Sequence, residues 1–375
     1  MNEAVRLAEV HSHPGSGYPV IAMDSLFDPG CGVLRDLIGD RPEALFVTSP
    51  TVDRLYGPKI DRYIERHAYS RTWHRIVCPS GEGNKSVDNA MELCAAALRA
   101  GIGRLGVFVV IGGGTVIDVA AFAASVYRRG VAHIRIGSTL LGQVDASVGA
   151  KCGVNFAENK NFLGAFHPPA AVVVDTDLLG SLDRRQVRAG MAEIIKIGAA
   201  CDRALLDDVR AWLAATAPDT RRQLLVRTCH RAAALIAVEL DQDLFERDLC
   251  RSLDFGHTVS PLLEIESGYA LNHGEAVAVD MAVSALLAER LGRLSSPAAR
   301  SLVDLLLAVG LPVWHPALTP DLVARALQKM TAHRGNLNLP LPAPLGAVEF
   351  VTHAAQIPAD AIDWSVRTVR ELAAG

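Results

Sequence analysis

Short apolar runs and segments of helical periodicity alternate through the first half of the chain. Runs rich in β-branched residues occur at ALFVTS (44–49), RLGVFVVIGGG (104–114), HIRIGS (133–138) and AVVVDT (171–176). Between them, NKSVDNAMELCAAALRAG and TVIDVAAFAASVYRRG carry apolar residues at helical spacing. The runs predict buried strands and the intervening segments predict helices. This alternation predicts an α/β fold with a doubly wound, Rossmann-like parallel sheet that has helices on both faces.

The pattern changes after about residue 178. Long segments of helical periodicity follow, namely VRAGMAEIIKIGAA, TRRQLLVRTCHRAAALIAVEL, GEAVAVDMAVSALLAERLG and AARSLVDLLLAVG, and strand-like runs almost vanish. We therefore predict two domains. The first, residues 1–177, is a nucleotide-binding α/β domain, and the second, residues 178–375, is mostly α-helical.

Composition narrows the class of protein. With 375 residues, 50% of them hydrophobic and 21% charged, the chain can form two packed domains. A net charge of −4 gives no electrostatic reason to expect a nucleic-acid partner. The longest apolar runs, such as LGVFVVI (105–111), are too short to span a bilayer. Seven cysteines without a repeated spacing favour free thiols, and the first residues lack a secretory signal pattern. We expect a cytoplasmic globular enzyme without membrane or nucleic-acid partners.

Three glycines separate a predicted strand from a predicted helix in VFVVIGGGTVIDVAAF. Bare backbone at Gly113 and Gly114 would let a pyrophosphate approach the amide groups at the helix start. The alternative is a tight turn that requires glycine only for steric reasons. A second loop, PSGEGNK (79–85), would bring Glu82 and Lys85 to ribose hydroxyls and phosphate, but it also fits a solvated turn.

Polar residues interrupt the apolar segment STLLGQVDASVGAKCGVNFAENKNFLGAF (138–166). Asp145, Lys151, Lys160 and Asn161 lie there among glycines and small residues. Ammonium groups supply point charge and an amide supplies directional donors, so the set indicates a phosphate or polyol site. A charged surface loop is the alternative.

One carboxylate and two imidazoles are candidate metal ligands. Glu193 and Lys196 share a helix face in GMAEIIKIG (190–198), where a simple intrahelical ion pair is the alternative interpretation. His257 follows a glycine in DFGHTVSP (254–261), and His273 precedes a helix in LNHGEAVAVD. Either histidine also fits a helix cap or a core position. Together with Glu193 they form the three-ligand set of a catalytic zinc site with one open position, and cobalt would also be accepted.

The motifs taken together resemble the sugar phosphate cyclase superfamily, whose best-known members are the dehydroquinate synthases. The matching segments run in order over roughly residues 75–285: PSGExxK, GGGxxxDxxxFxAxxxxRG, TLLxxVDxSVGxK, NKN at 159–161, AGMAEIIK, DFGHT and HGEAVAxDM. The resemblance implies a nucleotide-binding domain that holds NAD and a helical domain that holds Zn²⁺ or Co²⁺ on Glu193, His257 and His273. It also implies a homodimer that acts on a small sugar phosphate.

The resemblance further assigns roles to individual residues. Cofactor contacts fall on Ser49, Glu82, Lys85, Gly113, Gly114, Thr115, Val116, Asp118, Ser138, Thr139, Lys151, Lys160, Leu178 and Ser181. Catalytic roles fall on Asp145, Lys151, Lys196, Asp254, Asn161 and Arg129. The implied reaction is a transient oxidation by NAD, elimination of phosphate, re-reduction, and aldol closure to a carbocycle.

Four positions depart from the dehydroquinate synthase pattern. Ile236 and Cys250 stand where a lysine and an arginine would grip a substrate carboxylate, Asp254 replaces an asparagine, and Pro261 replaces a histidine. A buried carboxylate without a cationic partner is strongly disfavoured. These departures therefore favour a substrate without an acid group. They are similar to those of the sedoheptulose 7-phosphate cyclases, and of the 2-epi-5-epi-valiolone synthases among them.

Several alternatives stay open at this point. Another sedoheptulose 7-phosphate cyclase would make 2-epi-valiolone or demethyl-4-deoxygadusol. A 3-dehydroquinate synthase is disfavoured by the missing cations. A metal-dependent polyol dehydrogenase would show net NADH production, and a non-catalytic sugar-phosphate binding protein would release no phosphate. Ser49 stands where relatives often have an acidic residue for the adenosine ribose, so NADP stays open as an alternative to NAD.

Overall fold

The structure, a computed structural model, describes residues 4–13, 16–68, 71–157 and 159–374. It consists of two compact units. Unit 1 comprises Met1–Leu182 with Ile236–Phe245, and unit 2 comprises Asp183–Leu235 with Glu246–Gly375. The end of the long helix α7 (Pro218–Gln242) thus belongs to unit 1, where the Asp241 carboxylate accepts from the backbone N–H of His11 at 2.6 Å. The division after residue 177 stays a prediction, since this segment returns to the first unit.

Unit 1 is built on a seven-stranded sheet. The strands are β1 (Val5–His13), β2 (Ser16–Met23), β3 (Glu43–Thr48), β4 (Thr72–Val77), β5 (Val107–Gly112), β6 (Ala132–Gly137) and β9 (Ala171–Asp175). Their order is β1-β2-β9-β6-β5-β3-β4, and every pair is parallel except β1 with β2. The four strands expected from apolar runs are confirmed. The terminal hairpin β1–β2 and strand β4 were missed. In β4 (TWHRIV), exposed residues interrupt the apolar run at the edge of the sheet.

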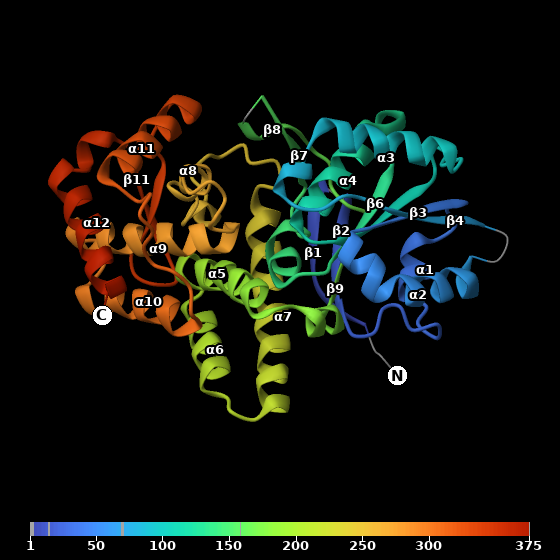
Figure 1. Cartoon of the computed structure of the whole chain (residues 1–375), viewed down its shortest axis with the longest axis horizontal. Coiled ribbons are helices and arrows are strands. Elements are labelled where there is room, and N and C mark those ends of the chain that lie inside the picture. Colours follow the sequence, from blue (N-terminus) through green and yellow to red (C-terminus); the bar gives the residue numbers. More distant parts are fainter. Residues whose placement is uncertain (1–3, 14–15, 69–70, 158, 375) are drawn as a thin grey trace. The chain divides into compact units, whose positions relative to one another are not determined.

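Helices cover both faces of this sheet, as the alternating pattern predicted (Figure 1). They are α1 (Val33–Ile38), α2 (Pro50–His67), α3 (Val87–Arg99) and α4 (Gly114–Val126). Successive strand residues point to opposite faces, so Phe46 packs in the cluster with Tyr63 of α2, whereas Leu45 packs in the cluster with Leu93 of α3. Both faces are thereby buried, which explains the continuous apolar runs.

Shorter elements join the sheet to the rest of unit 1. These are the 3₁₀ turns η1 (Glu82–Asn84), η2 (Tyr127–Arg129) and η4 (Thr176–Ser181), the π-helical turn η3 (Gly142–Ala146), and the antiparallel hairpin of β7 (Lys151–Phe156) with β8 (Asn159–Phe166). Sequence periodicity did not predict this hairpin, because polar residues break its pattern.

Unit 2 is mostly helical, as expected. Its helices are α5 (Arg184–Ala200), α6 (Arg203–Ala214), most of α7, α8 (Ser260–Glu266), α9 (His273–Arg290), α10 (Ser296–Val309), α11 (Pro320–Arg334) and α12 (Ala359–Ala374), with a 3₁₀ turn η5 (Ser252–Asp254). A two-stranded antiparallel pair, β10 (Leu339–Pro342) and β11 (Val348–Val351), completes it. Helix α9 is buried on almost every side from Gly274 to Ala288, so it forms the centre of this unit. Among the described residues, no helix is both long and apolar enough to cross a membrane.

Candidate active site

The three expected metal ligands converge within unit 2. One ligand atom from each of Glu193, His257 and His273 lies within 4.8 Å of the other two. Glu193 Oε1 is 3.3 Å from His273 Nε2 and 3.9 Å from His257 Nε2. The Glu193 side chain is fully buried, whereas both imidazoles are partly exposed. A carboxylate and two imidazole nitrogens at this spacing fit a divalent cation with one position open to a substrate.

The His257 loop is shaped by contacts with α9. Gly256 adopts a φ of +75°, and a Cβ there would lie 3.0 Å from Met281 Cγ, so a larger residue would be strained. The buried Asp280 carboxylate of α9 accepts from the backbone N–H groups of Val259 and Ser260 at 2.5 and 2.9 Å, and thereby caps α8. Pro261 occupies the first turn of α8, where its missing N–H has no intrahelical partner to lose.

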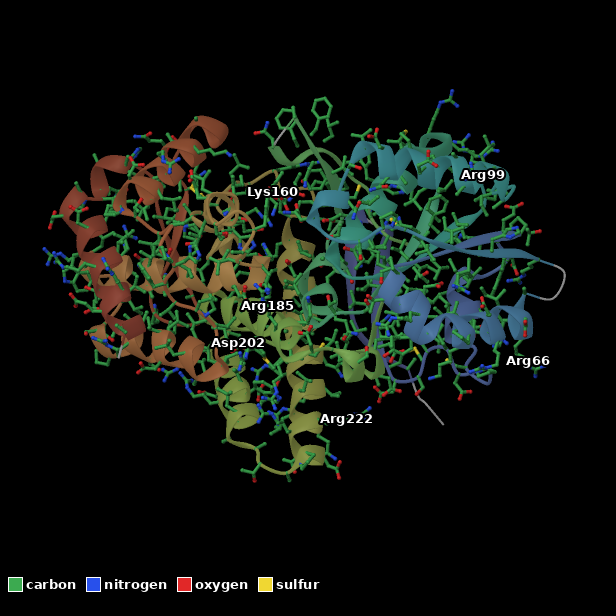
Figure 2. All side chains as sticks on the ribbon, viewed as in Figure 1. Arg66, Arg99, Lys160, Arg185, Asp202 and Arg222 are labelled. Atoms are coloured by element: carbon green, nitrogen blue, oxygen red, sulfur yellow. The ribbon has the colours of Figure 1, made fainter. Side chains whose placement is uncertain are left out.

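Helix α9 begins at His273 for local reasons. Asn272 and Glu275 form a capping box, in which each side chain accepts from the backbone N–H of the other. Arg185 of α5 (Figure 2) donates to both Glu275 carboxylate oxygens, at 2.7 and 2.6 Å. Gly274 lets the start of α9 approach α5, since a Cβ there would lie 2.3 Å from the carbonyl oxygen of Ala189. This close contact brings His273 to Glu193.

The second nitrogen of each imidazole has a defined neighbour. His257 Nδ1 lies 3.3 Å from the carbonyl oxygen of Phe255, and His273 Nδ1 lies 3.0 Å from Glu264 Oε1. Oxygen acceptors at Nδ1 favour the tautomer with Nε2 available as a metal ligand. The Nε2 atoms are the ones that lie nearest to Glu193.

The charges around the triad are strongly coupled. Lys196 Nζ is 2.5 Å from Glu193 Oε2, and both side chains are buried. Burial raises the pKa of the Glu193 carboxyl, but Lys196, His273 and His257 more than offset this and hold the pKa well below its usual range. Burial lowers the pKa of His273, whereas Glu193 and Glu264 raise it to about 10. A divalent cation would replace that proton, because metal ligation requires a neutral imidazole.

The loop before His257 corrects part of the sequence argument. Asp254, whose backbone carbonyl accepts from the His257 N–H at 3.0 Å, lies 3.4 Å from Arg251 Nη1, so a cation lies beside the anion that replaces the asparagine. Arg251 Nη1 also lies 2.6 Å from Glu246 Oε2. The three charges sum to −1. Of the two positions expected to have lost cations, Cys250 is exposed in unit 2. Ile236 is buried in unit 1, so its role beside a substrate stays a prediction.

Most of the expected cofactor residues lie where the parallel strands of unit 1 end. Ser49, Gly113, Ser138 and the η4 turn directly follow β3, β5, β6 and β9. The carboxyl ends of parallel strands form the usual nucleotide-binding edge of such sheets. A Cβ on Gly113 would lie 3.3 Å from Thr139 Cγ2, which places the glycine turn against the end of β6. Ser49 Oγ accepts from the Val52 N–H at 3.1 Å and caps α2.

The remaining cofactor residues occupy fixed positions nearby. Thr115, Val116 and Asp118 lie in the first turns of α4, whereas Leu178 and Ser181 lie in η4. Leu178 is buried, and Ser181 Oγ is 3.1 Å from the Tyr56 hydroxyl of α2. Val116 packs so closely on the glycine turn that a Cβ on Gly112 would lie 2.7 Å from it.

One ion pair connects the 82–85 loop to helix α4, and a second connects this loop to the β7–β8 hairpin. Lys85 Nζ is 2.5 Å from Asp118 Oδ2, and Lys160 Nζ on the β7–β8 hairpin (Figure 2) is 3.4 Å from Glu82 Oε1. Asn155 Nδ2 donates to Glu82 Oε1 at 2.9 Å, while Asn155 Oδ1 accepts from the backbone N–H of Asn161 at 2.9 Å. The structure therefore brings the 82–85 loop and the start of β8 together, and the anion-binding role of these residues stays a prediction.

The sequence analysis did not single out Arg135, a buried arginine that contacts the segment containing Asp145 and Lys151. Arg135 of β6 is fully buried and donates to the carbonyl oxygens of Gly149 and Lys151 at 2.5 and 3.2 Å. Its Nε donates to His133 Nε2 at 3.0 Å, and burial lowers the pKa of that histidine well below its usual range. Arg135 thus anchors the segment that runs from η3, which contains Asp145, to the first residue of β7. A charged residue inside the apolar run HIRIGS was the available signal.

The structure does not place Arg129 near the glycine turn. It is exposed and lies in η2, after the C-terminal end of α4, whereas the glycine turn lies at the other end of that helix. A helix of 13 residues spans roughly 20 Å. Within the described chain, Arg129 is therefore separated from the glycine turn, and its catalytic role stays a prediction.

Comparison with known proteins identifies the family. Family models described as the N-terminal and C-terminal parts of 3-dehydroquinate synthase match residues 75–189 and 190–333. A 2-epi-5-epi-valiolone synthase of Streptomyces glaucescens is 39% identical over 350 residues, which cover 93% of this chain and 90% of that protein. The chain belongs to the 3-dehydroquinate synthase-like family of sugar phosphate cyclases. The resemblance read from its motifs is confirmed.

Solved structures agree with this membership and with the expected fold class. The 2-epi-5-epi-valiolone synthase of Streptomyces hygroscopicus subsp. jinggangensis 5008, determined with NAD⁺ and Zn²⁺ bound, matches with a TM-score of 0.86 and 33% identity, covering 95% of this chain and 97% of that one. In sequence, a 3-dehydroquinate synthase of Acidithiobacillus ferrooxidans (strain ATCC 53993 / BNL-5-31) is 37% identical over 310 residues, which cover 82% of this chain and 81% of that protein. A 2-deoxy-scyllo-inosose synthase, at 21% identity and a TM-score of 0.78, shares the fold over 97% of this chain and all of that one.

Proposed function

We propose that the protein is a sedoheptulose 7-phosphate cyclase that releases phosphate and forms 2-epi-5-epi-valiolone. Its similarity to several 2-epi-5-epi-valiolone synthases, at 35–39% identity over most of the chain, supports the proposal. The reaction would consist of a transient oxidation of a ring hydroxyl, elimination of phosphate, re-reduction of the ketone, and intramolecular aldol closure. No net oxidation of the substrate would result.

Two bound groups would take part. NAD⁺ would occupy the carboxyl edge of the unit 1 sheet, and Zn²⁺ or Co²⁺ would be held by Glu193, His257 and His273. The donor set fits such a cation, since a fully buried carboxylate lies within reach of two imidazoles whose Nδ1 atoms already have acceptors. When bound, NAD⁺ supplies a hydride acceptor and the metal supplies a Lewis acid that makes a neighbouring hydroxyl more acidic.

The chain's own groups would bind and orient the substrate. In unit 2, the buried Lys196 would donate to ring hydroxyls and Asp254 would accept from them. In unit 1, Lys151, Lys160 and Asn161 would bind phosphate through charge and amide donors. Asp145 would lie near the nicotinamide, on the segment that Arg135 anchors. A phosphate held by these donors is oriented to leave as the neighbouring C–H loses its proton.

The charge of the loop that precedes His257 is the main support for the proposed substrate. Glu246, Arg251 and Asp254 sum to −1, because two carboxylates lie beside one guanidinium. A substrate carboxylate at this loop would meet net negative charge, and each cost of about 1.4 kcal/mol is a tenfold loss of affinity. A neutral hydroxymethyl ketone avoids that cost and can donate to Asp254. Sedoheptulose 7-phosphate has this character.

The test is incubation of the protein with sedoheptulose 7-phosphate, NAD⁺ and Zn²⁺ or Co²⁺. Phosphate release without accumulation of NADH, and an NMR spectrum of 2-epi-5-epi-valiolone, are expected. The acid-bearing precursor of 3-dehydroquinate is the control substrate and should be turned over poorly. Efficient use of the acid together with indifference to sedoheptulose 7-phosphate would refute the proposal.

3-Dehydroquinate synthase is the second candidate. The 37% identity to one such enzyme favours it. The same assay separates the two activities. It also excludes a polyol dehydrogenase if NADH does not accumulate, and it identifies a sister cyclase if the NMR spectrum is that of 2-epi-valiolone or demethyl-4-deoxygadusol.

We further propose that the enzyme acts as a homodimer in the cytoplasm. The chain has seven cysteines without a repeated spacing, as expected of a protein from a reducing compartment. The dimer is proposed from the family resemblance, and light scattering on the purified protein tests it directly.

A further inference from the structure

The carboxylate of Glu264 lies beside the metal cluster, and none of the catalytic roles proposed above involves it. Glu264 lies on α8 and is 5% exposed. Its Oε1 atom is 3.0 Å from Nδ1 of His273, the nitrogen that faces away from Glu193. A carboxylate this buried is disfavoured unless a cationic or hydrogen-bonding group faces it. His273 supplies such a group.

Helix α8 connects this carboxylate to the other histidine. The helix begins three residues after His257, and its N-terminal amides are held by Asp280 of α9. Helix α9 in turn begins at His273. The α8 segment therefore determines the position of one imidazole through the backbone and contacts the second through a side chain. A carboxylate at this site is well placed to control ligand geometry.

The two imidazoles differ in the charge of their Nδ1 partners. His257 faces a neutral carbonyl oxygen at 3.3 Å, whereas His273 faces a carboxylate at 3.0 Å. A carboxylate acceptor polarises the imidazole more strongly, which makes Nε2 a better electron donor and fixes the ring orientation. Of the two histidine ligands, His273 would thus bind a cation more tightly.

We propose that Glu264 is a positioning residue for the metal site, which sets the tautomer and ring orientation of His273 and strengthens binding of the divalent cation at Nε2. This inference rests on the proposed metal site. Glu264 touches neither substrate nor cofactor in this role and acts through His273. The competing explanation is that the Glu264–His273 contact only stabilises the packing of α8 on α9.

The experiment measures Zn²⁺ affinity of the full chain by competition with a chromophoric chelator, for the wild type, Glu264→Gln and Glu264→Leu. Glu264→Gln keeps the shape and an oxygen acceptor but loses the charge. Affinity should fall about 10-fold for Glu264→Gln and about 100-fold for Glu264→Leu, the range typical of changes to groups behind a metal ligand. The visible absorption of bound Co²⁺ should shift in the same order.

Glu266→Gln is the matched control. It removes the same charge from the same helix, but Glu266 is surface-exposed and pairs with Arg325 at 3.0 Å. Its Zn²⁺ affinity should equal that of the wild type. If Glu264 has only a structural role, Glu264→Gln should lower the melting temperature of the metal-depleted protein, while Zn²⁺ affinity stays within twofold of the wild type. That result would overturn the inference.

A second measurement keeps the inference testable if the Glu264 variants do not fold. Histidine NMR with isotopic nitrogen labelling of the Zn²⁺-loaded wild type should show His273 bound through Nε2, with a protonated, strongly hydrogen-bonded Nδ1. Metal binding through Nδ1 of His273 would refute the proposed arrangement. Failure of the wild type to bind Zn²⁺ would instead refute the metal site itself, so the two outcomes are distinguishable.

Discussion

The contact between Gly274 and Ala189 leads to a quantitative prediction for Gly274→Ala. The new Cβ would lie 2.3 Å from the Ala189 carbonyl oxygen and 2.5 Å from its Cα. Both are backbone atoms, so no side-chain rotation can relieve the overlap. Restoring an ordinary contact of roughly 3.4 Å requires the start of α9 to move about 1 Å away from α5, with a cost typical of overpacking, about 1–3 kcal/mol.

This displacement would act directly on the metal cluster. His273 is the residue before Gly274, and Glu193 is one helical turn after Ala189, so the shift separates two of the three ligands. Metal sites tolerate deviations of only about 0.2 Å in ligand distance. We therefore expect Zn²⁺ affinity to fall by more than the roughly 100-fold seen for groups behind a ligand. The melting temperature should fall by about 2–10 °C.

Gly292→Ala is the control for this experiment. Gly292 follows the far end of α9 with a φ of +72°, and among the described residues no neighbouring atom lies within 4 Å of the position that a Cβ would occupy. Alanine there costs about 1–2 kcal/mol of backbone strain without pushing any helix. It should lower the melting temperature but leave Zn²⁺ affinity intact. If Gly274→Ala also binds Zn²⁺ with wild-type affinity, the claim that this glycine sets the ligand spacing is wrong.

Three further predictions concern the same unit. Glu193→Ala or His273→Ala should abolish both metal content and turnover, and a metal-free variant with full activity would overturn the ligand assignment. Because the pKa of His273 is about 10 without a cation, its proton must leave when the metal binds. Zn²⁺ affinity should then rise about tenfold per pH unit between pH 7 and 9. Calorimetry in buffers of different ionisation enthalpy should detect about one released proton, and pH-independent affinity would contradict this. Asp254→Asn should raise the KM for sedoheptulose 7-phosphate about 10-fold through loss of a charged acceptor, and unchanged kinetics would exclude Asp254 as a hydroxyl ligand.

Much of the fold and the core of the candidate site could be predicted from local sequence patterns. Strands such as β5 are buried on both faces and read as continuous apolar runs, while helices such as α3 carry a one-sided apolar stripe. The glycine turn, Glu193, His257 and His273 stand in motifs whose residue types already indicate their chemistry. These properties are encoded locally, because periodicity and side-chain chemistry need no knowledge of distant neighbours.

The contacts between side chains of different helices became visible only in the folded chain. Nothing in the α8 segment marked Glu264 as a partner of His273 on α9. The close approach of Gly274 to Ala189 is likewise invisible to periodicity. Each contact joins residues whose separation in space depends on how whole helices pack. Packing is a collective property of the fold, whereas the pattern of a single segment records only whether its residues are buried.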